Sequence, residues 1–251
     1  MPAEPPRYTG PEYREALKAP AGAPLDPMRP PRLYRLVVTL ASRLIPVFFR
    51  LRVTGLEQLP PPPYLIAANH QAWYDAMFIL AAFPRRPMVA TMGRRDTVFN
   101  RAWKRWLMAR LGVFAISPNR GELDQEGVAS VYRALAAGGV VLIFPEGRYS
   151  RGRRLLPLKK GVGHFALEAG VPIVPVAVTG LDRLRPWGLV EVTVAPPVHF
   201  DAPFWWSLNQ KVAHLVERVG EAIQGAMQAT GNRGELGRRW LKRLRFRRRR
   251  L

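Results

Sequence analysis

A histidine and an aspartate stand five positions apart, at His70 and Asp75, in a pattern that could activate a hydroxyl group. An alcohol is a weak nucleophile at neutral pH, so a base has to take its proton as the new C–O bond forms. Imidazole titrates near neutral pH, and a carboxylate bonded to its far nitrogen fixes the tautomer and stabilises the imidazolium. The spacing permits that bond if His70 ends a strand and Asp75 begins the next helix. Asn69 would then either cap this helix or orient the loop.

A second candidate segment, residues 144–150, reads Phe-Pro-Glu-Gly-Arg-Tyr-Ser and follows a run of apolar residues. Gly147 permits a close backbone approach and unusual dihedral angles. Basic residues gather within and after the segment: Arg148, Arg151, Arg153, Arg154, Lys159 and Lys160. Arginine and lysine side chains suit a phosphate-bearing ligand, although a solvated basic loop would show the same pattern. Glu146 either pairs with one of these cations, or it hydrogen-bonds a glycerol group or orders the loop.

Alternating apolar segments predict the elements that would position these residues. A short apolar strand over residues 64–68 would deliver His70 at its carboxyl end, with a helix following over residues 73–83. A fully apolar strand over residues 140–144 would deliver Glu146 in the same way. Further strands are expected over 52–55, 88–92, 113–116, 173–178 and 190–194, and further helices over 98–111, 124–137, 161–169 and 205–228. This alternation predicts an α/β fold with a mostly parallel sheet flanked by helices, in which ligands bind at the carboxyl ends of the strands.

The order of these segments predicts a single domain with two flexible ends. Residues 1–32 are proline-rich and would form a flexible leader, residues 33–230 the domain, and residues 231–251 a basic tail. The domain would begin with an N-terminal amphipathic helix over residues 33–50, with Arg35, Arg43 and Arg50 away from the centre of its apolar stripe. This helix would either dock on the domain's own core or lie in the headgroup region of a membrane.

The chain of 251 residues carries a formal net charge of +21 and has no cysteine. Disulfides, thiolate nucleophiles and cysteine-based metal sites are therefore excluded, and with only four histidines no multi-histidine metal site is expected. The positive field would attract anionic partners such as phospholipid headgroups, nucleic acid or an acidic carrier protein. No apolar run reaches the length of about 18 residues that a membrane-spanning helix needs. The sequence therefore predicts a peripheral protein at the cytoplasmic face of a membrane.

The segment that holds His70 and Asp75 and the segment 144–150, in this order and at this separation, resemble two motifs of a known family. They are similar to the two central motifs of the glycerolipid acyltransferase family, the lysophosphatidic-acid acyltransferase-like enzymes. Residues 171–176, Val-Pro-Ile-Val-Pro-Val, resemble the fourth motif of the family, and Lys160 before Gly161 resembles the usual continuation. The second motif, in residues 112–120, matches in part, because Pro118 stands where the family has an arginine and Arg120 comes two places later. The resemblance covers about residues 50–200.

The resemblance implies an acyltransferase that makes phosphatidic acid in phospholipid biosynthesis. His70 would deprotonate the free hydroxyl of 1-acylglycerol 3-phosphate, and Asp75 would orient His70. The hydroxyl oxygen would attack the thioester of acyl-CoA or acyl-carrier protein directly, with no covalent acyl-enzyme and without a metal or another cofactor. The other expected contacts with the substrate are Asn69, Arg120, Glu146, Gly147, Arg148, Ser150 and Lys160.

Two alternatives to this function stay open. Pro118 in the second motif favours the same chemistry on another acceptor, such as a different lysophospholipid or a glycolipid. The basic composition would also fit a non-catalytic protein that binds membranes or nucleic acid, although such a protein has no need of the His70–Asp75 pair. The basic tail predicts an interfacial helix on an anionic membrane or a disordered segment. Nucleic acid is not an expected partner, since no nucleic-acid-binding fold is evident in the sequence.

Overall fold

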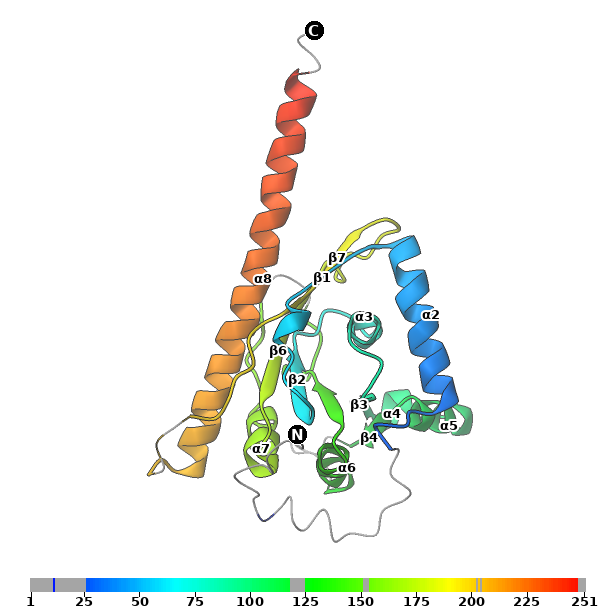
Figure 1. The fold of residues 1–251 in the computed structure, drawn as a ribbon, viewed down its shortest axis with the longest axis vertical. Helices are drawn as coiled ribbons and strands as arrows, with labels where there is room; N and C mark the ends of the chain where they lie inside the picture. The colour runs from blue at the N-terminus through cyan, green and yellow to red at the C-terminus, as the bar shows by residue number, and fades with distance from the viewer. Residues whose placement is uncertain are drawn as a thin grey trace.

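A seven-stranded sheet forms the centre of the computed structural model (Figure 1). The structure describes residues 11, 26–117, 125–150, 154–201, 203 and 205–247, with side chains as far as residue 230. The strands are β1 (Arg50–Thr54), β2 (Tyr64–Ala68), β3 (Val89–Arg94), β4 (Val113–Ile116), β5 (Val140–Ile143), β6 (Ile173–Thr179) and β7 (Leu189–Val194). Their order across the sheet is β1-β7-β6-β2-β5-β3-β4, and all neighbouring pairs are parallel except β6 and β7. The predicted α/β fold with a mostly parallel sheet is confirmed.

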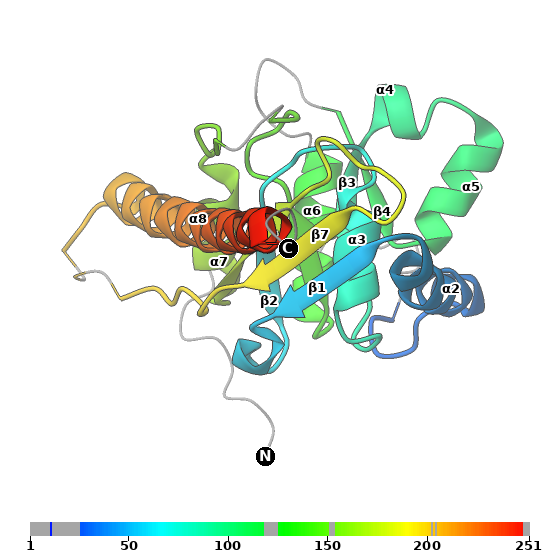
Figure 2. The ribbon, with the colours of Figure 1, turned by 90° about the horizontal axis from the view of Figure 1, so that it is seen from above.

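Helices cover both faces of this sheet (Figure 1, Figure 2). They are α2 (Arg32–Phe48), α3 (Asp75–Ala82), α4 (Arg95–Val98), α5 (Ala102–Arg110), α6 (Gln125–Ala136), α7 (Gly161–Ala169) and α8 (Leu208–Arg247), with a short 3-10 helix at Leu56–Gln58. Because side chains alternate along a strand, Leu65 and Ala67 of β2 pack with α6, α7 and α8. Ile66 and Ala68 pack on the other face, against α2 and α3. The sheet is therefore the middle layer of three.

The pairing of β2 with β5 places the two candidate segments side by side. Tyr64 lies beside Val140 and Ala67 beside Ile143 in a parallel register, so both strands end at the same edge of the sheet. Both strands are fully buried and read as continuous apolar runs, as strands covered on both faces do. From β2 the chain passes through α3 to β3, which lies on the far side of β5. Ligands of α/β folds bind at the carboxyl ends of strands where the strand order changes direction in this way.

Two predicted helices differ from the structure in extent. The expected helix over residues 98–111 is observed as α5, which begins only at Ala102 because the backbone at Arg101 is extended, with φ −131° and ψ 148°, and α4 is a separate helix that ends at Val98. Helix α8 begins at Leu208 and continues to Arg247, beyond the expected end near residue 228. A glycine inside a helix costs only about 1 kcal/mol, so Gly231 does not end it. Figure 1 shows the carboxyl half of α8 projecting beyond the sheet.

Helix α2 combines a buried side with an exposed apolar side. Tyr34, Val38 and Ile45 are buried, and the Tyr34 hydroxyl accepts the backbone N–H of Val89, at the start of β3, at 3.0 Å. Five apolar residues of the same helix are between 46% and 56% exposed: Leu36, Leu40, Leu44, Val47 and Phe48. The helix therefore docks on the core, as one of the two interpretations predicted, and also leaves an apolar stripe facing outward.

Candidate active site

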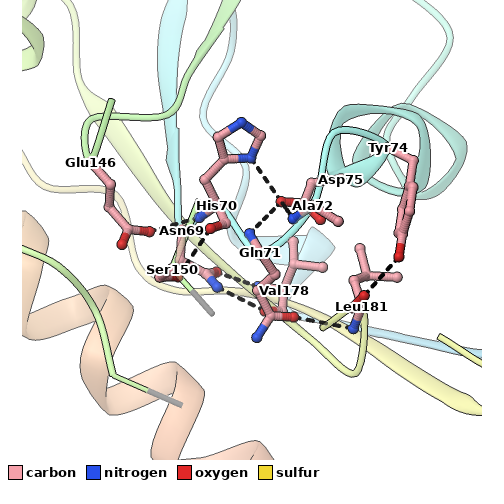
Figure 3. A network of polar contacts seen from close by, with 10 residues as sticks. All are labelled: Asn69, His70, Gln71, Ala72, Tyr74, Asp75, Glu146, Ser150, Val178 and Leu181. Atoms are coloured by element: carbon pink, nitrogen blue, oxygen red, sulfur yellow. Dashed lines mark hydrogen bonds and ion pairs between the residues drawn. The ribbon is translucent and has the colours of Figure 1, made fainter. Parts of the chain in front are cut away.

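His70 and Asp75 form a hydrogen-bonded pair at the carboxyl end of β2 (Figure 3). Nδ1 of His70 lies 2.8 Å from Oδ2 of Asp75, which is the first residue of α3 and is fully buried. The same carboxylate oxygen accepts the backbone N–H groups of Gln71 at 2.6 Å and of Ala72 at 2.9 Å. The loop thus holds the carboxylate, and the carboxylate in turn orients the imidazole. The predicted bond between the two side chains is present.

The other ring nitrogen of His70, Nε2, is the atom that would take a proton. Because a carboxylate accepts from Nδ1, that nitrogen carries the proton of the neutral ring and Nε2 keeps its lone pair. Nε2 has no hydrogen-bond partner among the described residues, and Figure 3 shows it pointing away from the polar network. The side chain of His70 is 17% exposed. Its lone pair is therefore available to a substrate hydroxyl at this edge of the sheet.

Glu146 and Ser150 hold both backbone groups of His70. Oε1 of Glu146 accepts the His70 N–H at 2.7 Å, and the His70 carbonyl accepts the Ser150 N–H at 2.6 Å and the Ser150 hydroxyl at 3.0 Å. Oε2 of Glu146 accepts the N–H of Leu156 at 2.9 Å. Burial raises the pKa of Glu146, while its bonds to the N–H groups of His70 and Leu156 act in the opposite direction. The two sequence segments therefore form one connected unit around His70.

Asn69 and Gln71 tie the His70 loop to β6 and to the segment that follows it (Figure 3). The Asn69 amide donates to the carbonyl of Val178 at 2.9 Å and accepts the Val178 N–H at 2.7 Å. Gln71 accepts the N–H of Leu181 at 3.1 Å, and the Tyr74 hydroxyl donates to the carbonyl of Leu181 at 2.9 Å. The position of His70 is therefore set from both neighbouring strands, β5 and β6.

Two aromatic rings flank the imidazole. The ring of Phe144 stacks on His70 with 4.0 Å between centroids and 14° between planes. The ring of Tyr149 meets His70 at 4.4 Å and 62°, in an edge-to-face arrangement. Neither Phe144 nor Tyr149 was predicted to have a role, although they are the first and sixth residues of the segment 144–150. Their position at the end of a predicted strand, beside a predicted base, could have indicated that they contact His70.

Known proteins share the sequence features of this site. Residues 50–179 match the family described as Acyltransferase, and this match covers more than half of the 251 residues. The chain belongs to the acyltransferase family. The matched residues include the His70–Asp75 pair and the whole segment 144–150, so the site described above lies within the family domain.

Individual relatives of this acyltransferase agree with the family assignment. The 1-acyl-sn-glycerol-3-phosphate acyltransferase of Salmonella typhimurium is 36% identical over 176 residues, which cover 61% of this chain and 69% of that protein. The chloroplastic enzyme BAT2 of Brassica napus, of the same name, is 29% identical over 150 residues, covering 59% of this chain but only 42% of the relative. The crystal structure of the acyltransferase PlsC from Thermotoga maritima aligns with a TM-score of 0.63 at 21% identity over 79% of each chain. This last similarity shows that the two proteins share a fold.

Three residues of this acyltransferase that were predicted to contact the substrate are buried instead. Asn69, Glu146 and Ser150 are at most 4% exposed, and their side chains bind backbone groups of the site itself. Asn69 does not cap α3 either, because its amide is bonded to β6 and the N-cap residue of α3 is Tyr74. Both Asn69 and Glu146 were considered as residues that orient or order a loop, and their hydrogen bonds agree with that interpretation. These three are positioning residues.

The described residues among the remaining predicted contacts, Gly147, Arg148 and Lys160, are exposed. Gly147 has φ +66°, and a Cβ there would lie 2.7 Å from Cε of Lys159, whose side chain covers it. Arg148 and Lys160 are exposed, and Lys160 is the N-cap residue of α7. Arg120 lies outside the described residues. Lys159, one of the basic residues named from the sequence, therefore lies against the glycine that follows Glu146.

Proposed function

We propose that this acyltransferase moves a fatty acyl group from acyl-CoA or acyl-carrier protein to the free hydroxyl of 1-acylglycerol 3-phosphate, giving phosphatidic acid. The observation that carries the proposal is the His70–Asp75 pair, with 2.8 Å between Nδ1 and Oδ2 and with Nε2 facing the open side. Relatives that carry the name 1-acyl-sn-glycerol-3-phosphate acyltransferase support this choice of acceptor. The oriented base supports transfer to a hydroxyl group.

In the proposed reaction, Nε2 of His70 takes the proton of the acceptor hydroxyl as its oxygen attacks the thioester carbonyl. The C–S bond of the tetrahedral intermediate then breaks, and the departing thiolate receives the proton from the imidazolium. The carboxylate of Asp75, 2.8 Å from Nδ1, stabilises the imidazolium in between. Two reactants held in place make the step effectively unimolecular. No acyl group is bonded to the protein, and no metal takes part in these steps.

The phosphate of the acceptor would be bound by cations beside the site. Arg148 and Lys160 are exposed there, and Lys159 lies over Gly147, which follows Glu146 directly. Arginine offers paired donors to a phosphate, while lysine offers a point charge. Arg154, which is exposed, would add to this group, and Arg120 stays a predicted contact outside the described residues. The partial match of the second motif, with Pro118, supports a second candidate function, which is the same transfer to another lysophospholipid or a glycolipid.

Replacing His70 with alanine tests the proposal. Acyl transfer from acyl-CoA and from acyl-carrier protein would be measured with lysophosphatidic acid, glycerol 3-phosphate, other lysophospholipids and a lipid alcohol as acceptors. Without the base, transfer to lysophosphatidic acid is expected to fall by roughly 10²–10⁴-fold, whereas the exposed His199 should tolerate alanine without loss.

Each outcome of this assay points to a different function. Preference of the wild type for another acceptor would support the second candidate function. Unchanged transfer in His70→Ala would refute the mechanism. No transfer from either donor to any acceptor, combined with binding to vesicles, would favour the non-catalytic alternative.

We further propose that the protein works on a membrane surface, docked through one apolar surface. Among the described helices, none is long and apolar enough to span a bilayer. The docking surface comprises the exposed stripe of α2 together with Trp187 and Trp73, which are 69% and 78% exposed. The backbone N–H of Trp187 donates to the carbonyl of Phe48, the last residue of α2, at 2.7 Å. Trp73 belongs to the His70 loop, so this surface leads from α2 to the site.

The chemistry of the docking surface fits the headgroup layer of an anionic membrane. Aliphatic side chains enter the apolar boundary, and tryptophan prefers the interface itself. Arg35 and Arg43 lie exposed on the same helix, where basic residues gain about 1 kcal/mol each near an anionic surface. Such an orientation would bring the opening beside His70 to the layer from which a lysophospholipid arrives.

Replacing Leu40 with glutamate is expected to lower the partition of the protein onto anionic vesicles by about tenfold, since a buried leucine contributes roughly 1.5–3 kcal/mol. Vesicle sedimentation measures this partition. Leu208→Glu is the matched control, because Leu208 is 42% exposed, close to the 46% of Leu40, and begins α8 on the opposite side of the molecule from α2 (Figure 2). Equal losses in the two variants would contradict a docking surface on α2 and leave only a general effect of charge.

A further inference from the structure

The ring of Tyr149 packs against the imidazole of His70 and is itself half exposed. His70 lies at a strand end facing the open edge of the sheet, yet its side chain is only 17% exposed. Phe144 covers one side of the imidazole by stacking on it, and the ring of Tyr149 approaches within 4.4 Å at a steep angle. Tyr149 itself is 50% exposed, so its outer side meets solvent. It is therefore the outermost of the rings that enclose the base.

The contact of Tyr149 with His70 is made by the ring, and its hydroxyl has no hydrogen-bond partner among the described residues. The backbone on either side is fixed, because Ser150 is bonded to the His70 carbonyl at 2.6 Å and 3.0 Å and the N–H of Gly147 donates to Phe144 at 3.1 Å. A ring carried on a fixed backbone, without a polar anchor, can rotate about its own side-chain bonds. Among the described residues, the ring of Tyr149 is thus positioned by packing, including its contact with the imidazole, and not by a hydrogen bond of its hydroxyl.

An exposed base with an open Nε2 would activate water as readily as a lipid hydroxyl. Nε2 would take a proton from water, the hydroxide oxygen would attack the thioester carbonyl, and the C–S bond would break. The thiolate would then receive the proton from the imidazolium. The products would be a free fatty acid and a free thiol, with no acceptor consumed. Excluding water from the base prevents this side reaction.

We propose that Tyr149 is a positioning residue that covers His70 and shields Nε2 from water, so that the acyl group goes to the acceptor hydroxyl and not to water. The inference rests on the proposed function, since it assigns the residue that favours transfer over hydrolysis at the same base. The ring carries the effect, and the hydroxyl is dispensable. The bound acceptor would displace the exposed ring from the imidazole as its own hydroxyl takes that place.

Paired variants of Tyr149 test this role through the ratio of hydrolysis to transfer. Release of free thiol counts both reactions, and acylated lipid counts transfer alone. Tyr149→Ala is expected to raise the ratio by on the order of tenfold, equivalent to about 1.4 kcal/mol between the two barriers. Tyr149→Phe keeps the ring and should keep the wild-type ratio. A general structural disturbance would slow both reactions and leave the ratio unchanged, so an unchanged ratio in Tyr149→Ala would overturn the proposal.

A second measurement does not depend on activity and separates this inference from the proposed function. Diethyl pyrocarbonate modifies exposed neutral imidazole, and mass spectrometry of the peptide that contains His70 gives the rate of its modification. Tyr149→Ala should be modified faster than the wild type, and Tyr149→Phe at the wild-type rate, whatever reaction the protein catalyses. Equal rates in all three proteins would refute the shielding role even if acyl transfer is found. Faster modification without any transfer would support the shield and reject the proposed function.

Discussion

Replacing Asp75 with asparagine is expected to lower kcat by roughly two to four orders of magnitude, with little change in KM. Three donors converge on Oδ2 of Asp75, namely Nδ1 of His70 and the N–H groups of Gln71 and Ala72. An asparagine oxygen in that place would keep the geometry but would lose the negative charge that stabilises the imidazolium. An asparagine NH₂ group there would face three donors and turn the imidazole away. Both outcomes act on the transition state more than on substrate binding.

Asp182→Asn is the matched control for this variant. Asp182 follows Leu181, the residue bonded to Tyr74 of the His70 loop, but it is exposed and has no contact with the imidazole. Its replacement should leave kcat unchanged. Steady-state kinetics with both substrates varied, on variants whose far-ultraviolet circular dichroism matches the wild type, gives the comparison. A kcat for Asp75→Asn close to that of Asp182→Asn would mean that no imidazolium forms in the rate-limiting step.

The His70–Asp75 pair could be predicted because its geometry is local. Five positions, a strand end and a helix start are enough to bring the two side chains together, and the apolar run of β2 marks the strand end. The same reasoning located the strands, since β2, β5 and β6 are continuous apolar runs between turn residues. Helix boundaries were harder to place, because the break at Arg101 and the continuation of α8 through Gly231 depend on backbone preferences of only about 1 kcal/mol.

The roles of Asn69, Glu146 and Ser150 could not be predicted, because their partners are backbone groups far away in the chain. Asn69 binds Val178, 109 positions later, and Glu146 binds the N–H of a residue 76 positions earlier. Every residue has a backbone carbonyl and every residue except proline has an N–H, so no side-chain identity in the sequence marks these partners. Polar residues beside a predicted base were therefore assigned to the substrate. The pairing of β2 with β5 and β6 decides instead that they hold the loop.

Glu146 holds the backbone of the proposed base, and its burial makes stability depend on pH. It is 4% exposed, and burial raises its pKa above the ordinary value of 4.5. The folded protein therefore binds this proton more tightly than the unfolded chain does. Its contribution to stability is fully present below pH 4.5 and is lost as the pH rises through the folded pKa. Two backbone N–H groups, of His70 and Leu156, donate to this carboxyl group, and these bonds oppose the effect of burial on its pKa.

Glu146→Gln is therefore expected to separate stability from activity. As the pH rises from 4.5 through the folded pKa, the wild type should lose unfolding free energy relative to the variant, which does not titrate. At neutral pH the variant should lose kcat by about a hundredfold, because glutamine offers one acceptor to two N–H groups and His70 shifts from its position. Denaturant unfolding at a series of pH values and kinetics at neutral pH measure the two effects.

Glu191→Gln is the control for this separation, because Glu191 is similarly buried, at 6% exposure, but lies in β7 and pairs with Arg52. Its replacement removes a buried carboxylate without touching the His70 loop, so kcat should stay at the wild-type value. A loss of kcat in both variants would show that activity follows general stability. A loss in Glu146→Gln alone would show that the carboxylate acts through the backbone of His70. Full activity in Glu146→Gln would mean that the position of His70 is set by Asn69, Gln71 and Asp75 without it.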